Sequence, residues 1–153
     1  LIQAWISVHA KHPDWKLKIV GDGIAKNELQ RIISYSGLEN SIEIEPSTKN
    51  IFLKFMEASL FVMSSRYEGF SLVFIEAMSA GLPVVAFDCK TGPKEVLSTG
   101  GGFLVAPEDV MGLAEMINRY IDSPDTWKDI SIAAVETSKR FSLENYKNEM
   151  DQF

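Results

Sequence analysis

Short apolar runs alternate with segments of helical periodicity along the chain, and this alternation constrains the fold more than any other feature of the sequence. The apolar runs predict strands at residues 17–20, 41–45, 60–63, 83–87 and 103–105. Helical spacing of apolar residues predicts helices at residues 1–12, 25–36, 51–58, 71–80, 110–121 and 124–139. Strands that are joined through helices pair in parallel. The expected architecture is therefore an α/β fold, a parallel sheet with helices on both faces.

The composition is that of one globular domain. With 153 residues and 46% hydrophobic content, the chain can bury one sizeable core. A net charge of -6 argues against binding to duplex nucleic acid or to an anionic lipid surface. Cys89 is the only cysteine, so no disulfide can form within the chain, and no Cys/His spacing predicts a metal site. Because no apolar run reaches the roughly 18 residues that span a bilayer, we expect a soluble domain.

The chain begins inside a helical pattern. Residues 1–8 already have helical spacing, and neither an initiator Met nor a capping residue precedes them. We therefore expect residues 1–153 to be a single domain, an N-terminally truncated fragment of a longer protein.

Ligands of parallel α/β sheets bind beyond the carboxyl ends of the strands, where the strand-to-helix loops meet. The loops in question are residues 21–23, 45–49, 64–71 and 88–93. The loop at residues 64–71 is the most informative, because it leads from a buried strand directly into an apolar helix. The first amides of that helix, near Gly69 to Leu72, have no acceptors within the helix, and the helix dipole adds to their effect. This position suits a diphosphate, which Gly69 allows to approach the backbone closely.

Two glutamates bracket this helix start. Glu68 lies just before the helix, and Glu76 follows about two turns, or roughly 11 to 12 Å of helical rise, later. The two carboxylates would therefore reach different parts of one ligand, for example the sugar and the ribose of a nucleotide-sugar, whose hydroxyls can donate to them. A glutamate in a helix is more often simply solvated. Glu76, however, stands among apolar residues, which predicts a buried helix in which a carboxylate needs a partner.

The spacing of Glu68 and Glu76, with seven residues between them and set within residues 66–85, closely resembles the EX7E motif of family 4 glycosyltransferases. The resemblance continues through residues 19–23, 88–95 and 102–105, and it covers nearly the whole chain. It implies a two-domain GT-B fold, of which this chain is the Rossmann-like C-terminal half, the nucleotide-sugar donor-binding domain. The acceptor-binding domain and the first strand of the donor domain would lie outside residues 1–153.

The resemblance also assigns roles to single residues. Glu68 would be the catalytic residue that contacts the transferred sugar, and Glu76 would hold the ribose. The residues assigned to substrate binding, with the last two on the opposite loop of the cleft, are Gly69, Phe70, Ser71, Leu72, Glu76, Gly21 and Gly23. Residues 45–47 lie where such enzymes often hold the base. Independently of the resemblance, Lys90 and Lys94 flank a glycine turn near the proposed phosphate site and are candidates for an anion contact. Neither a metal nor a cofactor is expected.

The implied activity of the full-length protein is transfer of a sugar from a nucleotide-sugar to a polysaccharide, glycan or lipid-linked acceptor, with retention of the anomeric configuration. Residues 87–95 resemble the variant found in transferases of capsular polysaccharide and exopolysaccharide biosynthesis, many of which use UDP-sugars. The acceptor would bind through the N-terminal domain, and the isolated fragment would be inactive. The implied location is cytoplasmic, at the inner face of the cell membrane, with peripheral association of the full-length protein. No nucleic acid is an expected partner.

Three alternatives stay open at the level of the sequence. Gly21-Asp22-Gly23 could begin a dinucleotide-binding turn, but Lys26 occupies the place of the third glycine. A sugar-nucleotide epimerase or hydrolase of GT-B architecture would differ in the catalytic groups of its other half. A binding module without activity would lack a catalytic group there.

Overall fold

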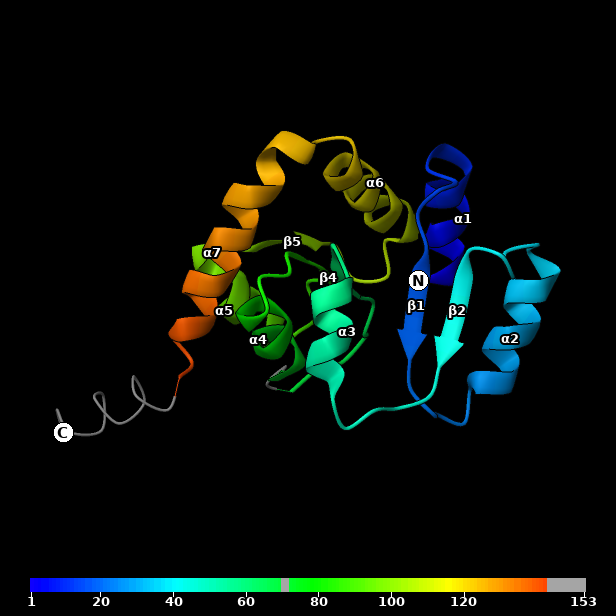
Figure 1. Cartoon of the computed structure of the whole chain (residues 1–153), viewed down its shortest axis with the longest axis horizontal. Coiled ribbons are helices and arrows are strands. Elements are labelled where there is room, and N and C mark those ends of the chain that lie inside the picture. Colours follow the sequence, from blue (N-terminus) through cyan, green and yellow to red (C-terminus); the bar gives the residue numbers. More distant parts are fainter. Residues whose placement is uncertain (70–71, 143–153) are drawn as a thin grey trace, which may run out of the picture.

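The computed structural model describes residues 1–69 and 72–142. Helices and strands alternate along the chain, as predicted (Figure 1). In chain order the elements are α1 (Ile2–Lys11), β1 (Leu17–Val20), α2 (Lys26–Tyr35), β2 (Ile42–Glu45), α3 (Ile51–Glu57), β3 (Phe61–Met63), α4 (Leu72–Ser79), β4 (Val84–Phe87), α5 (Pro93–Val96), the 3-10 helix η1 (Leu97–Thr99), β5 (Gly102–Val105), α6 (Val110–Ile121), the 3-10 helix η2 (Pro124–Thr126) and α7 (Trp127–Lys139).

The strands form two sheets, and every described strand pair is parallel. β1 pairs with β2, while β3, β4 and β5 pair in that order. Figure 1 shows the β1-β2 pair beside the larger sheet. The predicted parallel α/β fold is confirmed, but the strands divide where one sheet was expected. The division falls between β1 and β3, where residues of both strands line a cavity of about 650 Å³.

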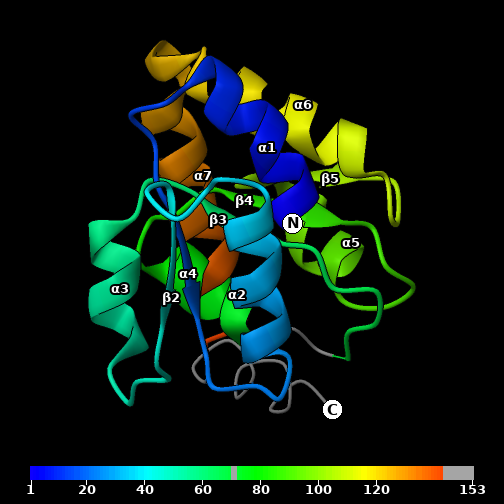
Figure 2. The same ribbon diagram turned by 90° about the vertical axis from the view of Figure 1, so that its right-hand side faces the viewer.

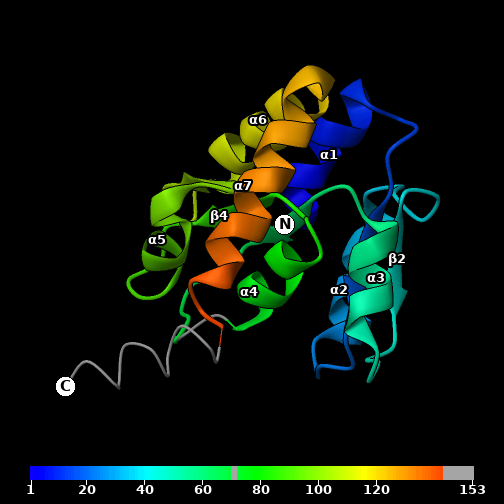
Figure 3. The ribbon, with the colours of Figure 1, turned by 60° about the vertical axis from the view of Figure 1, so that its left-hand side comes forward.

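β4 lies at the centre of the larger sheet and is buried along its whole length. Side chains alternate between the two faces of a strand. Val85 and Phe87 accordingly belong to the core that α1 and α6 cover, and Val84 and Ala86 belong to the core that α4 and α7 cover. Figure 2 shows α1 and α6 side by side, and Figure 3 shows α7 passing α4. Helices thus cover both faces of this sheet, as predicted.

α4 ends at Ser79, and Gly81 follows shortly after it. Gly81 has a φ of 81°, a left-handed conformation that favours glycine. The N–H of Gly81 donates to the carbonyl of Met78 at 2.9 Å, and the N–H of Leu82 donates to that of Ala77 at 3.1 Å. This is a Schellman motif, which satisfies the last carbonyls of the helix and turns the chain toward β4.

Tryptophan side chains hold several elements together. Trp5 of α1 is buried, and its Nε1 donates to Ser41 Oγ at 3.2 Å. Trp127 stacks on Tyr120, with ring centroids 5.2 Å apart, and meets Trp15 edge-on at 5.8 Å. The start of α7 is therefore fixed both to α6 and to the segment that leads into β1.

The described helices are short. α7, the longest of them, has 13 residues, and α5 has only 4, which is too few for a helical period to be read from the sequence. Within residues 1–69 and 72–142, no helix combines the length and the apolar character needed to cross a membrane.

Candidate functional site

The loops that follow the strands carry the candidate residues. In parallel sheets such loops lie at the carboxyl edge, which is the lower edge of β1 and β2 in Figure 1. The loops after β1 and β2 span residues 21–25 and 46–50, and the loop after β4 spans residues 88–92. The loop after β3 leads from Ser64 toward α4. Two residues predicted to bind the diphosphate, Phe70 and Ser71, fall there but lie outside the described residues.

Asp22 joins the two loops of the smaller sheet. Its Oδ2 accepts hydrogen bonds from the backbone N–H and the hydroxyl of Ser47, each at 2.7 Å. Its Oδ1 lies 3.4 Å from Nζ of Lys26, the first residue of α2. The hydrogen bonds from Ser47, together with Lys26, lower the pKa of Asp22. An ionised Asp22 therefore holds the loops after β1 and β2 together.

Glu68, the predicted catalytic residue, is half-buried in the loop after β3. Its carbonyl accepts a hydrogen bond from Thr91 Oγ1, which belongs to the loop after β4. Arg66 forms an ion pair with Glu108, in the loop after β5, with 2.6 Å between Nε and Oε1. Both ion-pair side chains are exposed, so the pair contributes little stability by itself. Together these contacts link the three loops of the larger sheet.

Glu76, predicted to hold the ribose, is exposed on α4. Leu72 and Ser79 share its face of the helix, at the spacing of i, i+4 and i+7, and both are exposed. Phe74 and Met78 lie on the other face and are fully buried. The expectation that apolar neighbours bury Glu76 is therefore wrong, because those neighbours cover one face of α4 and Glu76 occupies the other.

The separation of the two glutamates also differs from the expected helical rise. α4 begins at Leu72, so Glu76 lies one turn, or roughly 6 Å of rise, inside the helix. Glu68 precedes the helix and belongs to the loop. One carboxylate thus approaches the helix start from the loop and the other from the helix surface. Their assignment to a sugar and a ribose stays a prediction.

The glycines predicted to line the site face open space. A Cβ added at Gly21, Gly23 or Gly69 would meet no described heavy atom within 4 Å. At Gly101, by contrast, an added Cβ would lie 2.5 Å from Cα of Ala134. Close packing within the described residues therefore explains why a glycine is needed at position 101. It does not explain the three loop glycines, and the open space beside them leaves room for a ligand to approach their backbone.

Two of the contacts between loops were not predicted. Asp22 and Ser47 are 25 residues apart, and Glu68 and Thr91 are 23 residues apart. All four residues lie within or beside predicted strand-to-helix loops, and this location was the only signal in the sequence. No periodicity or short motif pairs residues at such separations.

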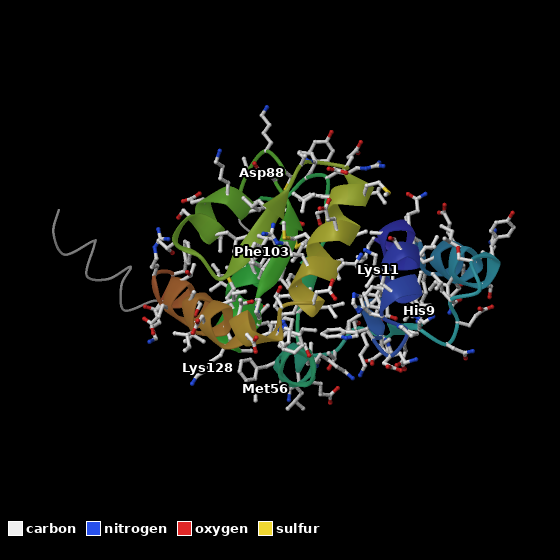
Figure 4. The ribbon with its side chains drawn as sticks, turned by 90° about the horizontal axis from the view of Figure 1, so that it is seen from above. His9, Lys11, Met56, Asp88, Phe103 and Lys128 are labelled. Atoms are coloured by element: carbon white, nitrogen blue, oxygen red, sulfur yellow. The ribbon has the colours of Figure 1, made fainter. Side chains whose placement is uncertain are left out.

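Asp88 is the first residue after β4, so it lies at the carboxyl edge of the larger sheet. Figure 4 shows it across the molecule from Met56 of α3 and Lys128 of α7. Lys90 and Lys94, the candidates for an anion contact, are exposed in the segment that follows. Within the described part of the chain, no three His, Cys, Asp or Glu side chains are arranged to hold a metal ion.

A family model described as "Glycosyl transferases group 1" matches residues 1–123, and both glutamates lie within the match. The chain belongs to the group 1 glycosyl transferases. The predicted glycosyltransferase class is confirmed at this level, and the epimerase and binding-module alternatives are not favoured.

Two curated relatives align with nearly the whole chain, and one of them is named a glycosyltransferase. The chain is 37% identical over 145 residues to an exopolysaccharide phosphotransferase of Streptomyces coelicolor, an alignment that covers 94% of this chain and 15% of that protein. It is 38% identical over 144 residues to the amylovoran biosynthesis glycosyltransferase AmsD of Erwinia amylovora, covering 94% of this chain and 40% of AmsD. The chain thus spans less than half the length of either relative.

Solved structures of GT-B glycosyltransferases share the fold. A TarM variant from S. aureus, in complex with fondaparinux, alpha-GlcNAc-glycerol and UDP, matches with a TM-score of 0.91 and 26% identity over 99% of this chain and 31% of TarM. HepE of Anabaena, in complex with UDP, matches with a TM-score of 0.84 and 27% identity over 97% of this chain and 43% of HepE. The predicted fold class is therefore confirmed.

Proposed function

We propose that the full-length protein is a retaining glycosyltransferase of family 4 and that residues 1–153 form its donor-binding domain. The acceptor would bind to a further domain in the rest of the protein. In support, the chain covers only 40% of AmsD and 31% of TarM, so relatives have ample additional length. The cytoplasmic location and the peripheral association with the membrane belong to the same proposal.

The placement of Glu68 and Glu76 on either side of the start of α4 is the main support for a donor site here. An anion at this helix start would meet free backbone amides and the positive end of the helix dipole. Glu68 would accept hydrogen bonds from hydroxyls of the transferred sugar. Glu76, exposed one turn into the helix, would accept them from the ribose. The loop that carries Gly21 and Gly23 would face them across the ligand.

The proposed donor is a UDP-sugar, and the proposed acceptor is a saccharide or a lipid-linked glycan. UDP is present in the complexes of TarM and HepE, which supports uracil as the base. AmsD is named as a glycosyltransferase of amylovoran biosynthesis, which supports a saccharide acceptor. The relative from Streptomyces coelicolor is named an exopolysaccharide phosphotransferase, so it supports only a link to polysaccharides.

In the proposed reaction, the bond between the anomeric carbon and the diphosphate oxygen breaks, and a bond to the acceptor hydroxyl oxygen forms. The proton of that hydroxyl passes to the leaving diphosphate oxygen. The helix amides stabilise the charge on the leaving diphosphate. Attack from the face of the leaving group retains the anomeric configuration. Glu68 would then position the sugar and stabilise positive charge at the anomeric carbon without forming a covalent bond.

Calorimetric titration of the full-length protein with UDP, GDP, ADP and NAD tests the donor site. We expect UDP to bind most tightly and Glu76→Ala to weaken it roughly 10- to 100-fold, because hydrogen bonds to a charged group contribute about 1.5–3 kcal/mol. Glu115→Ala, which removes an exposed carboxylate from α6, is the matched control and should leave the affinity unchanged.

Either of two results would contradict the site. NAD could bind more tightly than every nucleoside diphosphate, or Glu76→Ala could behave like the control.

The retaining mechanism has its own test, which is NMR of the product formed from an α-linked UDP-sugar. An α-anomeric product is expected, and a β-anomeric product would refute retention.

A further inference from the structure

The loop after β4 holds the backbone of the loop after β3 through one side chain. The hydroxyl of Thr91 donates a hydrogen bond to the carbonyl of Glu68. Thr91 is exposed, so water can satisfy both groups when they separate, and the bond contributes little to stability. Its effect is instead on direction, because it fixes one peptide group at the entrance to the candidate donor site.

That peptide group joins Glu68 to Gly69. No described peptide bond is cis, and in a planar trans peptide the C=O and the N–H point in opposite directions. Because Thr91 holds the carbonyl of Glu68, the N–H of Gly69 points away from the loop after β4. Within residues 1–69 and 72–142, no group accepts a hydrogen bond from this N–H. The N–H of Gly69 is therefore a donor of fixed direction that a ligand can use.

The surroundings of Gly69 leave this donor accessible. Gly69 is exposed, and a Cβ added to it would meet no described heavy atom within 4 Å. It lies shortly before Leu72, the first residue of α4. An anion at the positive end of α4 could therefore accept a hydrogen bond from Gly69 as well.

Thr91 lies on a constrained turn. The thiol of the buried Cys89 donates to the carbonyl of Thr91, with 3.8 Å between Sγ and O. Gly92 follows in a left-handed conformation, with a φ of 95°, and Pro93 is fully buried at the first position of α5. A hydroxyl on such a backbone can hold its acceptor in one direction.

The ion pair of Arg66 with Glu108 does not have this property. Arg66 reaches Glu108 through a long side chain, and both side chains are largely exposed. A contact through several rotatable bonds does not fix the direction of a backbone group. Thr91, in contrast, bonds to the backbone of the loop directly.

We propose that Thr91 is a positioning residue of the donor site, which directs the N–H of Gly69 toward the donor diphosphate through the carbonyl of Glu68. This inference rests on the proposed function and deepens it. Negative charge grows on the diphosphate as its bond to the anomeric carbon breaks. A backbone donor already aimed at that charge stabilises the transition state more than the bound substrate, so Thr91 should affect kcat more than KM.

Three variants of the full-length protein test this role. Thr91→Val removes the hydroxyl and keeps the shape of the side chain, whereas Thr91→Ser keeps the hydroxyl. Thr126→Val is the matched control, because the hydroxyl of this exposed threonine also donates to a backbone carbonyl, that of Ser123, at 2.8 Å. For transfer from a UDP-sugar, we expect Thr91→Val to lower kcat roughly 10-fold and to change KM less than about twofold. Thr91→Ser and Thr126→Val should match the parent protein.

A measurement without nucleotide separates this inference from the proposed function. The residual dipolar coupling of the Gly69 amide, recorded by NMR, reports the direction of its N–H bond. We expect Thr91→Val to change this coupling, while Thr91→Ser and Thr126→Val leave it unchanged. If the parent protein transferred sugar from no UDP-sugar, the proposed function would fail, and the coupling would still decide whether Thr91 sets the direction of the N–H.

Several results would overturn the positioning role. The Gly69 coupling or kcat could be the same in Thr91→Val as in the parent protein. Thr91→Ser could behave like Thr91→Val, which would assign the effect to the methyl group of Thr91. Urea unfolding could also show that Thr91→Val is much less stable than Thr126→Val, which would attribute the loss of kcat to unfolding.

Discussion

Asp22 couples two loops through a single carboxylate. Its carboxylate accepts hydrogen bonds from the backbone N–H and the hydroxyl of Ser47 and lies beside Lys26. The contact between the loops after β1 and β2 therefore depends on the ionisation of Asp22. Two other single residues matter in the same way. Glu76 presents an exposed carboxylate on α4, and Gly101 permits a close approach between α7 and the backbone just before β5. Single substitutions should therefore give clear and separable effects.

Protonation of Asp22 should release Ser47 only below the ordinary pKa of an aspartate. Hydrogen bonds from Ser47 and the nearby Lys26 lower the pKa of Asp22 below its ordinary value of 3.8. The link is thus fully present above pH 3.8 and is lost as the pH falls through the lowered pKa. The amide chemical shift of Ser47, followed by NMR in the full-length protein, should titrate with a midpoint below 3.8. Asp22→Asn should abolish the titration, and a midpoint above 3.8 would count against the link.

Gly101→Ala should destabilise the full-length protein by roughly 2–4 kcal/mol. The added Cβ would lie 2.5 Å from Cα of Ala134, and the φ of 83° is unfavourable for alanine. Urea unfolding measures the loss of free energy of unfolding. Gly23→Ala is the control, since its Cβ would meet nothing within 4 Å, and it should change the stability little. Equal effects of the two substitutions would contradict the close packing.

Packing, more than end-capping, stabilises the helices. Of the helices whose starts are described, only α6 has a capping side chain, with Asp109 Oδ1 accepting the N–H of Gly112 at 2.8 Å. α1 has neither a side-chain cap nor an acidic first turn, yet Val8 and Trp5 are almost fully buried. This dependence on buried faces explains why apolar periodicity located the elements so well.

The Asp109 side chain that caps α6 should contribute measurably to stability. Asp109→Ala should lower the free energy of unfolding by about 1 kcal/mol, because one amide at the helix start loses its acceptor. Glu115→Ala changes an exposed residue in the middle of the same helix and should be nearly neutral. The two variants can be compared by urea unfolding of the full-length protein. If they have the same stability, the cap contributes nothing measurable.

The elements were largely predictable from the sequence, and the contacts of the site were not. Strands such as β1 and β4 stand out as apolar runs, and α4 stands out by the helical spacing of its apolar residues. The exposure of Glu76 was missed because its neighbours in the sequence are apolar, although they lie on a different face of the helix. The partners of Asp22 and Glu68 come from other loops, and only the folded sheets bring them together.

At the scale of the whole molecule, Tyr120 connects parts that are distant in the sequence. It lies on α6, stacks on Trp127, and donates its hydroxyl to the carbonyl of Ser59, just before β3, at 2.8 Å. Burial raises the pKa of Tyr120 to about 12. Its neutral form is therefore part of the folded state.

The stability of the full-length protein should consequently fall in strong alkali. Tyr120 ionises near pH 10 when unfolded but only near pH 12 when folded, so the free energy of unfolding decreases as the pH rises between these values. Urea unfolding at pH 9, 10 and 11 should record the decrease. Tyr120→Phe should lose less stability over the same range, since phenylalanine cannot ionise. If the free energy of unfolding decreased equally in both proteins, ionisable groups other than Tyr120 would be responsible for the decrease.

Two of the contacts between loops each stay within one sheet. Asp22 and Ser47 belong to the loops of β1 and β2, and Glu68 and Thr91 belong to loops of the larger sheet. Each pair of loops can therefore shift as a unit, so a small change in the separation of the two sheets would widen or narrow the candidate site without breaking either contact.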